Sequence, residues 1–113
     1  MAEKFELKHK ELQDAEFTDL NLSGVKMDNV NMQNAHFMDM NMAGTKFGGM
    51  CMDNTSFACV DFKNAEYHNA DMEGAVLTDC KLNNVQIMNC DIQGLTIDGV
   101  DIAVLLEKIN EIE

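Results

Sequence analysis

Apolar side chains recur along this chain at a fixed interval of five residues. From Phe17 onward, a large apolar residue occupies every fifth position. These positions are Phe17, Leu22, Met27, Met32, Phe37, Met42, Phe47, Met52, Phe57, Phe62, Tyr67, Met72, Leu77, Leu82, Ile87, Ile92, Ile97 and Ile102. A period of five matches neither the 3.6-residue period of an α-helix nor the two-residue period of a β-strand. The pattern therefore predicts a stacked repeat.

Each unit also has a slim residue and a turn-forming residue at fixed places. Two residues before the large one lies a small or slim residue such as Ala35 or Ala65, with Leu20 and Met40 among the larger members. Two residues after it lies Asp, Asn or Gly in almost every unit, and these residues turn corners at low cost. An extended stretch with both apolar side chains inward, followed by a turn, fits this unit. Four units then close a square coil, and coils stack about 4.8 Å apart through backbone hydrogen bonds.

This unit resembles the repeat of the pentapeptide-repeat family, whose consensus is Ala, then Asp or Asn, then Leu or Phe, then two variable residues. The unit AlaAspMetGluGly at 70–74 matches it closely, and the units at 15–19 and 35–39 match its spacing. The resemblance implies an all-β solenoid, a right-handed quadrilateral β-helix. We expect five coils from Phe5 to Val104, which would be about 24 Å tall.

The two ends depart from the regular unit within what we predict to be one domain, 1–113. Residues 1–14 keep the register, but Phe5 is bulky at a slim position and Lys10 is charged at an inward one. A degenerate coil or cap is the favoured interpretation, and an amphipathic helix is the alternative. Regular repeats are expected over 15–104. A C-terminal capping helix is expected over about 102–112, with Asp101 as its N-cap.

The predicted C-terminal helix is apolar over a broad arc. Leu105, Ile109 and Ile112 form one stripe, and Ile102 and Leu106 form a second stripe beside it. One stripe can plug the open coil. The other is left either for burial in the cap or for a homodimer contact, for which the candidates are Leu105, Leu106, Ile109 and Ile112.

Composition restricts the classes of partner. The chain has 20 acidic residues against 8 basic ones and a formal net charge of −12. This balance argues against direct binding to nucleic acid or anionic membranes, because such binding depends on Lys and Arg. No apolar run approaches the roughly 20 residues of a membrane span. Residues 1–10 lack the apolar segment of a signal peptide, so a cytoplasmic location is expected.

The register places most of the acidic side chains on one side of the predicted prism. Two adjacent walls, beginning at 10–14 and 15–19, carry all of their Asp and Glu outward, and their only Lys is Lys10, which is expected to point inward. These candidate partner-binding acids are Glu11, Asp14, Asp53, Asp71, Glu73, Asp91, Glu16, Asp19, Asp39, Asp79 and Asp98. The other two walls balance Lys against Asp and Glu. Such an acidic side attracts a basic partner.

We therefore predict a non-catalytic protein-interaction scaffold whose partner is an unknown protein, basic or DNA-binding. An acidic face that only keeps a β-stack soluble is the plainer interpretation of the same charges. The resemblance adds a third, because the best-known activity in the family is DNA mimicry toward DNA gyrase. Duplex DNA carries one charge per about 1.7 Å, so a prism of about 24 Å would need about fourteen charges. Mimics in the family are generally longer rods, and the gyrase-protecting ones usually carry projecting loops, which this chain lacks.

Chemistry of other kinds has weaker support in the sequence. Cys80 and Cys90 fall at inward slim positions, no CxxC occurs, and the His residues lie on different walls or coils, so no zinc site is expected. Most Met residues fall at inward positions, where they fill the tube rather than bind copper.

No cofactor or catalytic residue is predicted, because a filled tube without loops offers no pocket for an enzyme or a metalloprotein. A weak Ca²⁺ site at Asp53, Asp71, Glu73 and Asp91 is conceivable, but exposed clusters of this kind are more often solvated. Tyr67 is the one inward residue with a polar tip. Its hydroxyl must find a backbone group or water, or reach an end of the tube.

Overall fold

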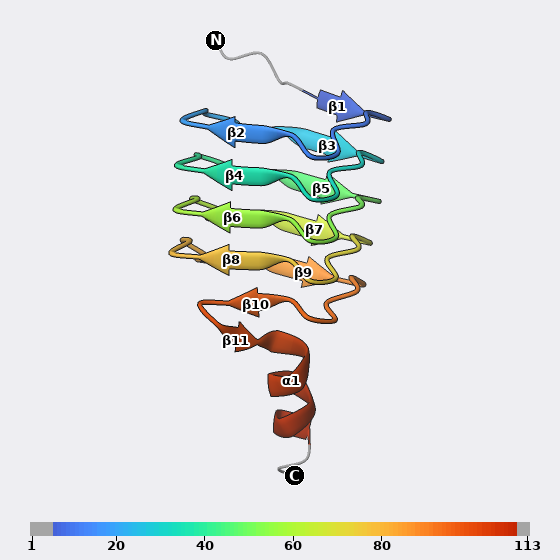
Figure 1. The fold of residues 1–113 in the computed structure, drawn as a ribbon, viewed down its shortest axis with the longest axis vertical. Coiled ribbons are helices and arrows are strands. Elements are labelled where there is room, and N and C mark those ends of the chain that lie inside the picture. The colour runs from blue at the N-terminus through green and yellow to red at the C-terminus, as the bar shows by residue number, and fades with distance from the viewer. Residues whose placement is uncertain (1–5, 111–113) are drawn as a thin grey trace.

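The chain folds into a single stack of coils followed by one helix (Figure 1). The computed structural model describes residues 6–110. Its elements are β1 (Glu6–Lys8), β2 (Glu16–Thr18), β3 (Lys26–Asp28), β4 (His36–Met38), β5 (Lys46–Gly48), β6 (Ser56–Ala58), β7 (Glu66–His68), β8 (Val76–Thr78), β9 (Gln86–Met88), β10 (Thr96–Ile97), β11 (Val100–Asp101) and α1 (Ile102–Asn110).

Two opposite walls of the prism are β-sheets whose strands pair in parallel, except that β11 pairs antiparallel with β10. One sheet has the order β1-β3-β5-β7-β9, and the other has the order β11-β10-β8-β6-β4-β2. The pairing joins residues of equivalent repeat position, so Phe37 lies beside Phe17 and Phe57. The remaining two walls are joined by isolated bridges such as Asn31 with Cys51. The expectation of an extended stretch on every side therefore holds fully for only two walls.

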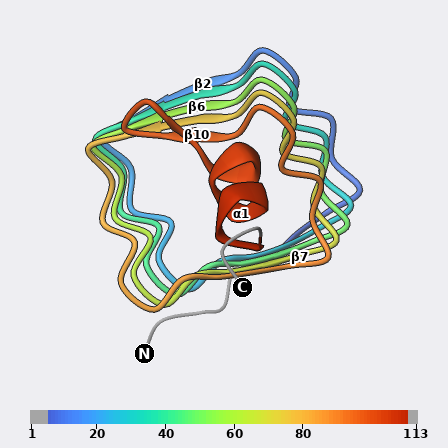
Figure 2. The ribbon, with the colours of Figure 1, turned by 90° about the horizontal axis from the view of Figure 1, so that it is seen from below.

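The prism is a right-handed quadrilateral β-helix, as expected. Seen from the C-terminal side, the chain runs counter-clockwise as it advances toward the viewer (Figure 2). Four successive parallel pairings connect β1 to β9, so the solenoid makes about four turns. The expected count of five was too high because the repeat geometry stops before the repeat pattern of the sequence does.

The corners of the coils require a left-handed backbone. In every described unit up to residue 99, the corner residue has a positive φ, between 53° and 83°. Asp, Asn and Gly occupy nearly all these corners, with His9 and Cys59 as the departures. Such residues adopt this conformation at lower cost than other residues do. The recurrence of Asp, Asn and Gly in the sequence is therefore explained first by backbone geometry.

The interior is filled by ladders of stacked side chains, as the register predicted. The rings of Phe17 and Phe37 stack at 4.9 Å between centroids, and those of Phe37 and Phe57 at 4.6 Å. The inward methionines are all buried, namely Met27, Met32, Met40, Met42, Met50, Met52 and Met72. A flexible thioether fills irregular gaps in a core well.

Polar groups at the slim inward positions are bonded back to the backbone. The buried hydroxyl of Thr55 donates to the carbonyl oxygen of Met52 at 2.8 Å, and that of Thr45 donates to Met42 in the same way. Cys80 and Cys90 are only partly buried. The thiol of Cys90 donates to the carbonyl oxygen of Tyr67 at 3.6 Å. A hydroxyl or thiol therefore fits a slim position wherever a carbonyl lies within reach.

The N-terminal coil is looser than the pattern suggested. Strand β1 pairs with β3, in agreement with a degenerate coil rather than a helix over residues 6–8, whereas residues 1–5 lie outside the described chain. Lys10 was expected to point inward, but it is exposed. Leu20, also assigned inward, is 46% exposed. Both lie in the first described coil, which has no complete coil above it to cover these positions.

The repeat geometry ends at Ile97, earlier than the predicted residue 104. Strand β11 folds back antiparallel on β10, pairing Val100 with Ile97. Asp98 and Gly99 both have positive φ and form the two-residue turn, as type I′ hairpins require. An Asp-Gly pair between apolar residues is itself a hairpin signal that the five-residue register masked.

Helix α1 begins at Ile102, where the sequence predicted it, and Asp101 caps it. The Val104 backbone N–H donates to the Asp101 carboxylate at 3.1 Å. The helix leaves the last coil along the long axis of the molecule rather than lying across the opening (Figures 1 and 2). Of the described residues in the two predicted apolar stripes, Ile102 packs against the core, whereas the other three are exposed, so neither stripe as a whole plugs the coil. The predicted end at 112 lies outside the described residues.

Candidate protein-interaction surfaces

The eleven predicted acidic side chains form two adjoining walls of the prism. The first acidic wall, joined by isolated bridges, carries Glu11, Asp14, Asp53, Asp71, Glu73 and Asp91; the second acidic wall, built on β2, β4, β6, β8 and β10, carries Glu16, Asp19, Asp39, Asp79 and Asp98. None of the eleven is buried. Their one Lys is the exposed Lys10 near the N-terminal end. The structure therefore places all eleven where a partner can reach them.

Several of these acidic residues also occupy positions where the backbone turns. Four of them stand at corners with positive φ, namely Asp14, Asp19, Asp39 and Asp79, and Asp98 has a positive φ in the β10–β11 turn. Asn and Gly occupy equivalent corners on other coils. The conformation therefore explains why a small polar residue stands there, but it does not explain why that residue is charged.

Asp71 lies at the centre of the first acidic wall. It forms a bridge pair with Asp91 on the next coil, and carboxylate oxygens of Asp71, Glu73 and Asp91 lie within 4.8 Å of one another. The pKa of the Asp71 carboxyl is raised, first by a hydrogen bond with the Asp53 carboxyl, then by partial burial and by the charges of Asp53 and Asp91. The close spacing of these carboxylates makes the local potential of the wall negative.

The other two walls neutralise their own charges. Lys63 lies 3.7 Å from the Asp61 carboxylate, and Lys26 lies 4.0 Å from that of Asp28. On the same walls, His68 lies 3.2 Å from Glu66. Because each of these pairs joins neighbouring residues of one wall, little net charge remains for a partner. The acidity of the molecule is therefore one-sided in the structure as well.

The second acidic wall is also hollowed, which the sequence did not indicate. A shallow depression of about 370 Å³ crosses β2, β4 and β6, lined in part by Glu16, His36, Met38 and Ser56. Met38 is 52% exposed. Met38 falls at an outward position of the repeat, and this is the one feature of the sequence that could have identified it as an exposed apolar residue. The wall thus combines an exposed apolar side chain with surrounding carboxylates.

Glu16, His36 and Ser56 stand in line in this depression, on three paired strands. The order resembles an acid, base and nucleophile. In the described residues, however, no hydrogen bond joins their side chains. The backbone N–H groups of His36 and Ser56 donate to Ala15 and Ala35, so they are not free to hold an oxyanion. The arrangement lacks the contacts that nucleophilic catalysis requires.

Helix α1 presents apolar side chains to solvent on more than one side. Leu105, Leu106 and Ile109 are 42%, 46% and 52% exposed. Val104, which the sequence assigned to the last repeat, is exposed beside them. Ile112, the fourth candidate contact, lies outside the described residues. A helix with apolar side chains from both stripes exposed has the composition of a self-association surface.

The thiols are not arranged for chemistry. All four cysteines are free, and Cys59 occupies a corner. Burial is the main cause that raises the pKa values of the Cys51 and Cys80 thiols. A raised thiol pKa lowers the thiolate fraction and hence the reactivity toward electrophiles and metals.

Comparison with known proteins identifies the class of repeat. The model of the family "Pentapeptide repeats" matches in 8 copies, over residues 6–34, 21–58 and 55–94. The chain belongs to the pentapeptide-repeat family. Members of this family are generally structural scaffolds without catalytic activity.

One solved structure with a TM-score above 0.5 shows the same fold. HetL, a pentapeptide-repeat protein involved in heterocyst differentiation regulation from the cyanobacterium Nostoc sp. strain PCC 7120, matches with a TM-score of 0.54 and 20% identity. The match covers 81% of this chain and 41% of HetL, so the chain spans less than half of that protein. Rfr23 from Cyanothece 51142 matches at 14% identity over 82% of this chain and 87% of its own, with a TM-score of 0.41.

A trypsin-treated form of QnrB1, a plasmid-mediated fluoroquinolone resistance protein, matches at 10% identity with a TM-score of 0.33, over 96% of this chain and 98% of its own. A comparison with curated proteins finds no match. Among the described residues, no helix has both the length and the apolar character needed to cross a membrane.

Proposed function

We propose that this protein is a non-catalytic interaction scaffold whose two acidic walls bind a basic surface on another protein. The observation that carries the proposal is the segregation of charge. Eleven accessible acids share two walls, whereas the opposite walls pair Lys with Asp on neighbouring residues. A purely solubilising surface needs no such segregation, because interspersed charges of both signs serve solubility as well.

The depression on the second acidic wall gives the surface a shape as well as a charge. A lysine or arginine side chain of the partner can lay its aliphatic stem against Met38 and place its charge near Glu16. The rigid parallel register holds these groups in place before binding, and this reduces the entropy lost on association.

Corner variants test the proposal because they remove charge without changing the backbone requirement. The triple variant Asp19→Asn, Asp39→Asn, Asp79→Asn removes three charges from the second acidic wall, and Asn tolerates the left-handed corner as Asp does. The matched control, Asp28→Asn, Asp61→Asn, Glu66→Gln, removes three charges from the neutral walls. A fluorescent deca-lysine peptide serves as the probe, with its Kd measured by anisotropy at low and physiological salt.

We expect the corner variant to weaken peptide binding about tenfold at low salt, and the control to weaken it about twofold or less. Equal losses in the two variants would mean that net charge alone attracts the peptide. The acidic walls would then be a solubilising surface and the proposal would fail.

DNA mimicry toward DNA gyrase or another DNA-binding protein is the second candidate. The observation that favours it is the alignment of Asp19, Asp39 and Asp79 at equivalent corners of different coils, which forms a row of charge along the solenoid axis. A supercoiling assay with gyrase at micromolar protein is the test. Mimicry predicts inhibition by the wild type that is lost in the corner variant; unchanged supercoiling with the wild type would exclude gyrase as the target.

We also propose that α1 joins two copies of the chain. Its support is the exposure of Leu105, Leu106 and Ile109 on a helix that packs on little besides β11. Sedimentation at two concentrations should show a dimer for the wild type. A monomer is expected for Leu105→Gln, Leu106→Gln, Ile109→Gln, with circular dichroism as the control for folding. A wild type that stays monomeric at high concentration would contradict this contact.

A further inference from the structure

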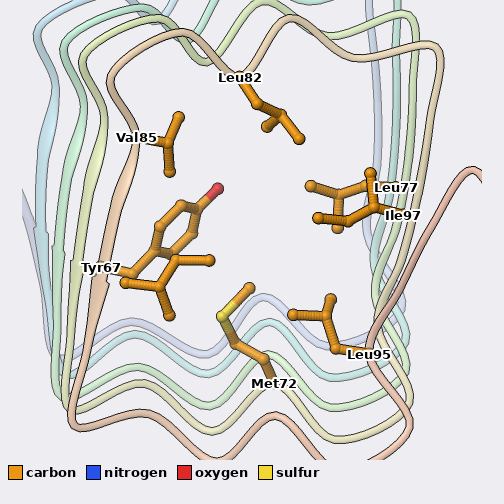
Figure 3. A pocket seen from close by; sticks show the side chains of 8 residues that line it. Tyr67, Met72, Leu77, Leu82, Val85, Leu95 and Ile97 are labelled. Atoms are coloured by element: carbon orange, nitrogen blue, oxygen red, sulfur yellow. The ribbon is translucent and has the colours of Figure 1, made fainter. Parts of the chain in front are cut away.

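The C-terminal end of the tube contains a partly open cavity that the filled-tube prediction did not anticipate. It has a volume of about 180 Å³ and is lined by Tyr67, Met72 and six aliphatic residues from the last coils, among them Leu82, Val85 and Leu95 (Figure 3). The cavity lies on the C-terminal side of the last aromatic layer and is partly open to solvent there, where the lining residue Ile87 is 38% exposed. A small molecule can therefore reach it from the C-terminal side.

The cavity arises from a change of side-chain size along the ladders. The third complete layer places Phe57, Phe62 and Tyr67 in the tube, where their rings meet at 5.0 Å and 5.9 Å between centroids. One coil later, the same ladder positions hold Leu77, Leu82 and Ile87. An aliphatic side chain is smaller than a ring, and the backbone spacing of a solenoid is fixed, so the unfilled volume remains below the aromatic layer.

The hydroxyl of Tyr67 points into this volume. The residue is 1% exposed, and its oxygen has no hydrogen-bond partner in the described chain. Figure 3 shows the oxygen directed away from the backbone, toward Val85 and Leu82. Burial raises the pKa of Tyr67 well above its ordinary value, so the hydroxyl keeps its proton and is a hydrogen-bond donor.

Water is a poor occupant for this site. A buried water makes two to four hydrogen bonds, whereas the side chains lining the cavity offer a single polar atom. An apolar cavity of about 150 Å³ is known to accept benzene in a protein core. The present volume is therefore sufficient for a six-membered ring with one small substituent.

We propose that this cavity binds a small monocyclic aromatic compound carrying one oxygen, which accepts a hydrogen bond from the Tyr67 hydroxyl. The aliphatic walls contact the ring, and the single donor sets its orientation. The ligand class is defined by these two features, apolar bulk of ring size and one hydrogen-bond acceptor. This site is independent of the acidic walls and of their partner.

The test uses phenol and benzene as probes, which differ by the one oxygen. Their Kd values are measured by titration with NMR detection of the methyl groups of Leu82, Val85 and Ile97. We expect both probes to shift these methyl signals in the wild type. In Tyr67→Phe the affinity for phenol should fall about tenfold, while the affinity for benzene stays within about twofold.

A filling variant tests the place of binding. Leu82→Phe puts a ring at the ladder position that Phe62 occupies one coil earlier, so the tube is known to accept it there. It should abolish binding of both probes, whereas Leu82→Met, which keeps a flexible apolar side chain, should retain it. Melting curves verify that each variant is folded.

Two outcomes would overturn the proposal. The first is a wild type whose cavity methyl signals do not move with either probe at millimolar concentration. The second is probe binding that disappears as the protein self-associates, because the volume would then belong to a contact between two copies of the chain.

Discussion

The middle coils and the last coil are built from the same five-residue unit, yet their interiors differ. In the middle, Phe37, Phe57 and Phe62 are 1% exposed or less. In the last coil, Ile87 is 38% exposed and a cavity remains beside it. The difference shows that the repeat determines whether a side chain points inward or outward. Its burial depends on what the neighbouring coil supplies.

The largest expected effect comes from removing a ring in the middle of the stack. Phe57→Ala deletes a side chain that stacks on Phe37 at 4.6 Å and contacts Phe62, and should lower the free energy of unfolding by about 3–5 kcal/mol. Ile87→Ala, at the partly exposed coil, should cost about 1 kcal/mol. Urea unfolding followed by circular dichroism measures both. Equal losses would mean that burial does not differ between the two regions.

A corner glycine provides the second comparison. Gly74→Ala introduces a Cβ at a φ of +71°, 2.5 Å from the Asn54 side-chain oxygen. Gly99→Ala has a φ of +83° but no neighbour within 4 Å. Both substitutions should lower the free energy of unfolding by about 1–2 kcal/mol, because alanine is strained in the left-handed backbone conformation. Gly74→Ala should lower it by about 1 kcal/mol more, because Asn54 must move. Denaturant midpoints check the order, and a larger loss for Gly99→Ala would reverse the expected ranking.

Removing a buried hydroxyl group should change the stability in opposite directions in the two regions. The Thr55 hydroxyl in the middle is bonded to Met52, whereas the Tyr67 hydroxyl facing the last coil has no partner in the described chain. Thr55→Val should therefore destabilise by about 1 kcal/mol, and Tyr67→Phe should stabilise by about 1 kcal/mol. Thermal melts of the two variants beside the wild type decide this. A loss of stability in Tyr67→Phe would show that the hydroxyl is satisfied in solution.

The smallest expected effect concerns the carboxylates around Asp71. Its raised pKa means that the folded state binds the proton more tightly than the unfolded chain does. The stabilising contribution of the protonated group is therefore complete below the ordinary pKa of 3.8 and is lost as the pH rises through the raised value. Asp71→Asn should be slightly more stable than the wild type at pH 7, and the difference should vanish near pH 3. Urea midpoints at the two pH values measure this, and an advantage that persists at pH 3 would contradict it.

The sequence was sufficient for the register of the solenoid, because one large residue in five and one turn residue in five are each tied to a single backbone position. Phe37 and Phe57 lie in the predicted ladder, and Asp39 lies at its predicted corner. The end of the repeat was not predictable from the same pattern, because Ile97 and Ile102 keep the spacing while Asp98 and Gly99 reverse the chain. Spacing alone carries no information about whether the next coil exists.

The surface features were likewise predictable only in part. Outward positions follow from the register, so the accessible acids were predicted by position. The depression near Met38 and the cavity beside Tyr67 depend on side-chain volumes summed over neighbouring coils, which no single unit specifies. The direction in which α1 leaves the last coil depends on the β10–β11 turn. Local helix propensity predicts that a helix forms but does not predict the direction of its axis.

The hairpin of β10 and β11 has a consequence for length control. A parallel solenoid presents, at its end, a strand edge on which another chain can continue the stack, which is how fibrils grow. Strand β11 covers that edge on one sheet with an antiparallel partner. The other sheet ends in β9, a strand of three residues. The hairpin therefore acts as a terminator on one of the two sheets, because β11 occupies the edge of β10 on which a further parallel strand would add.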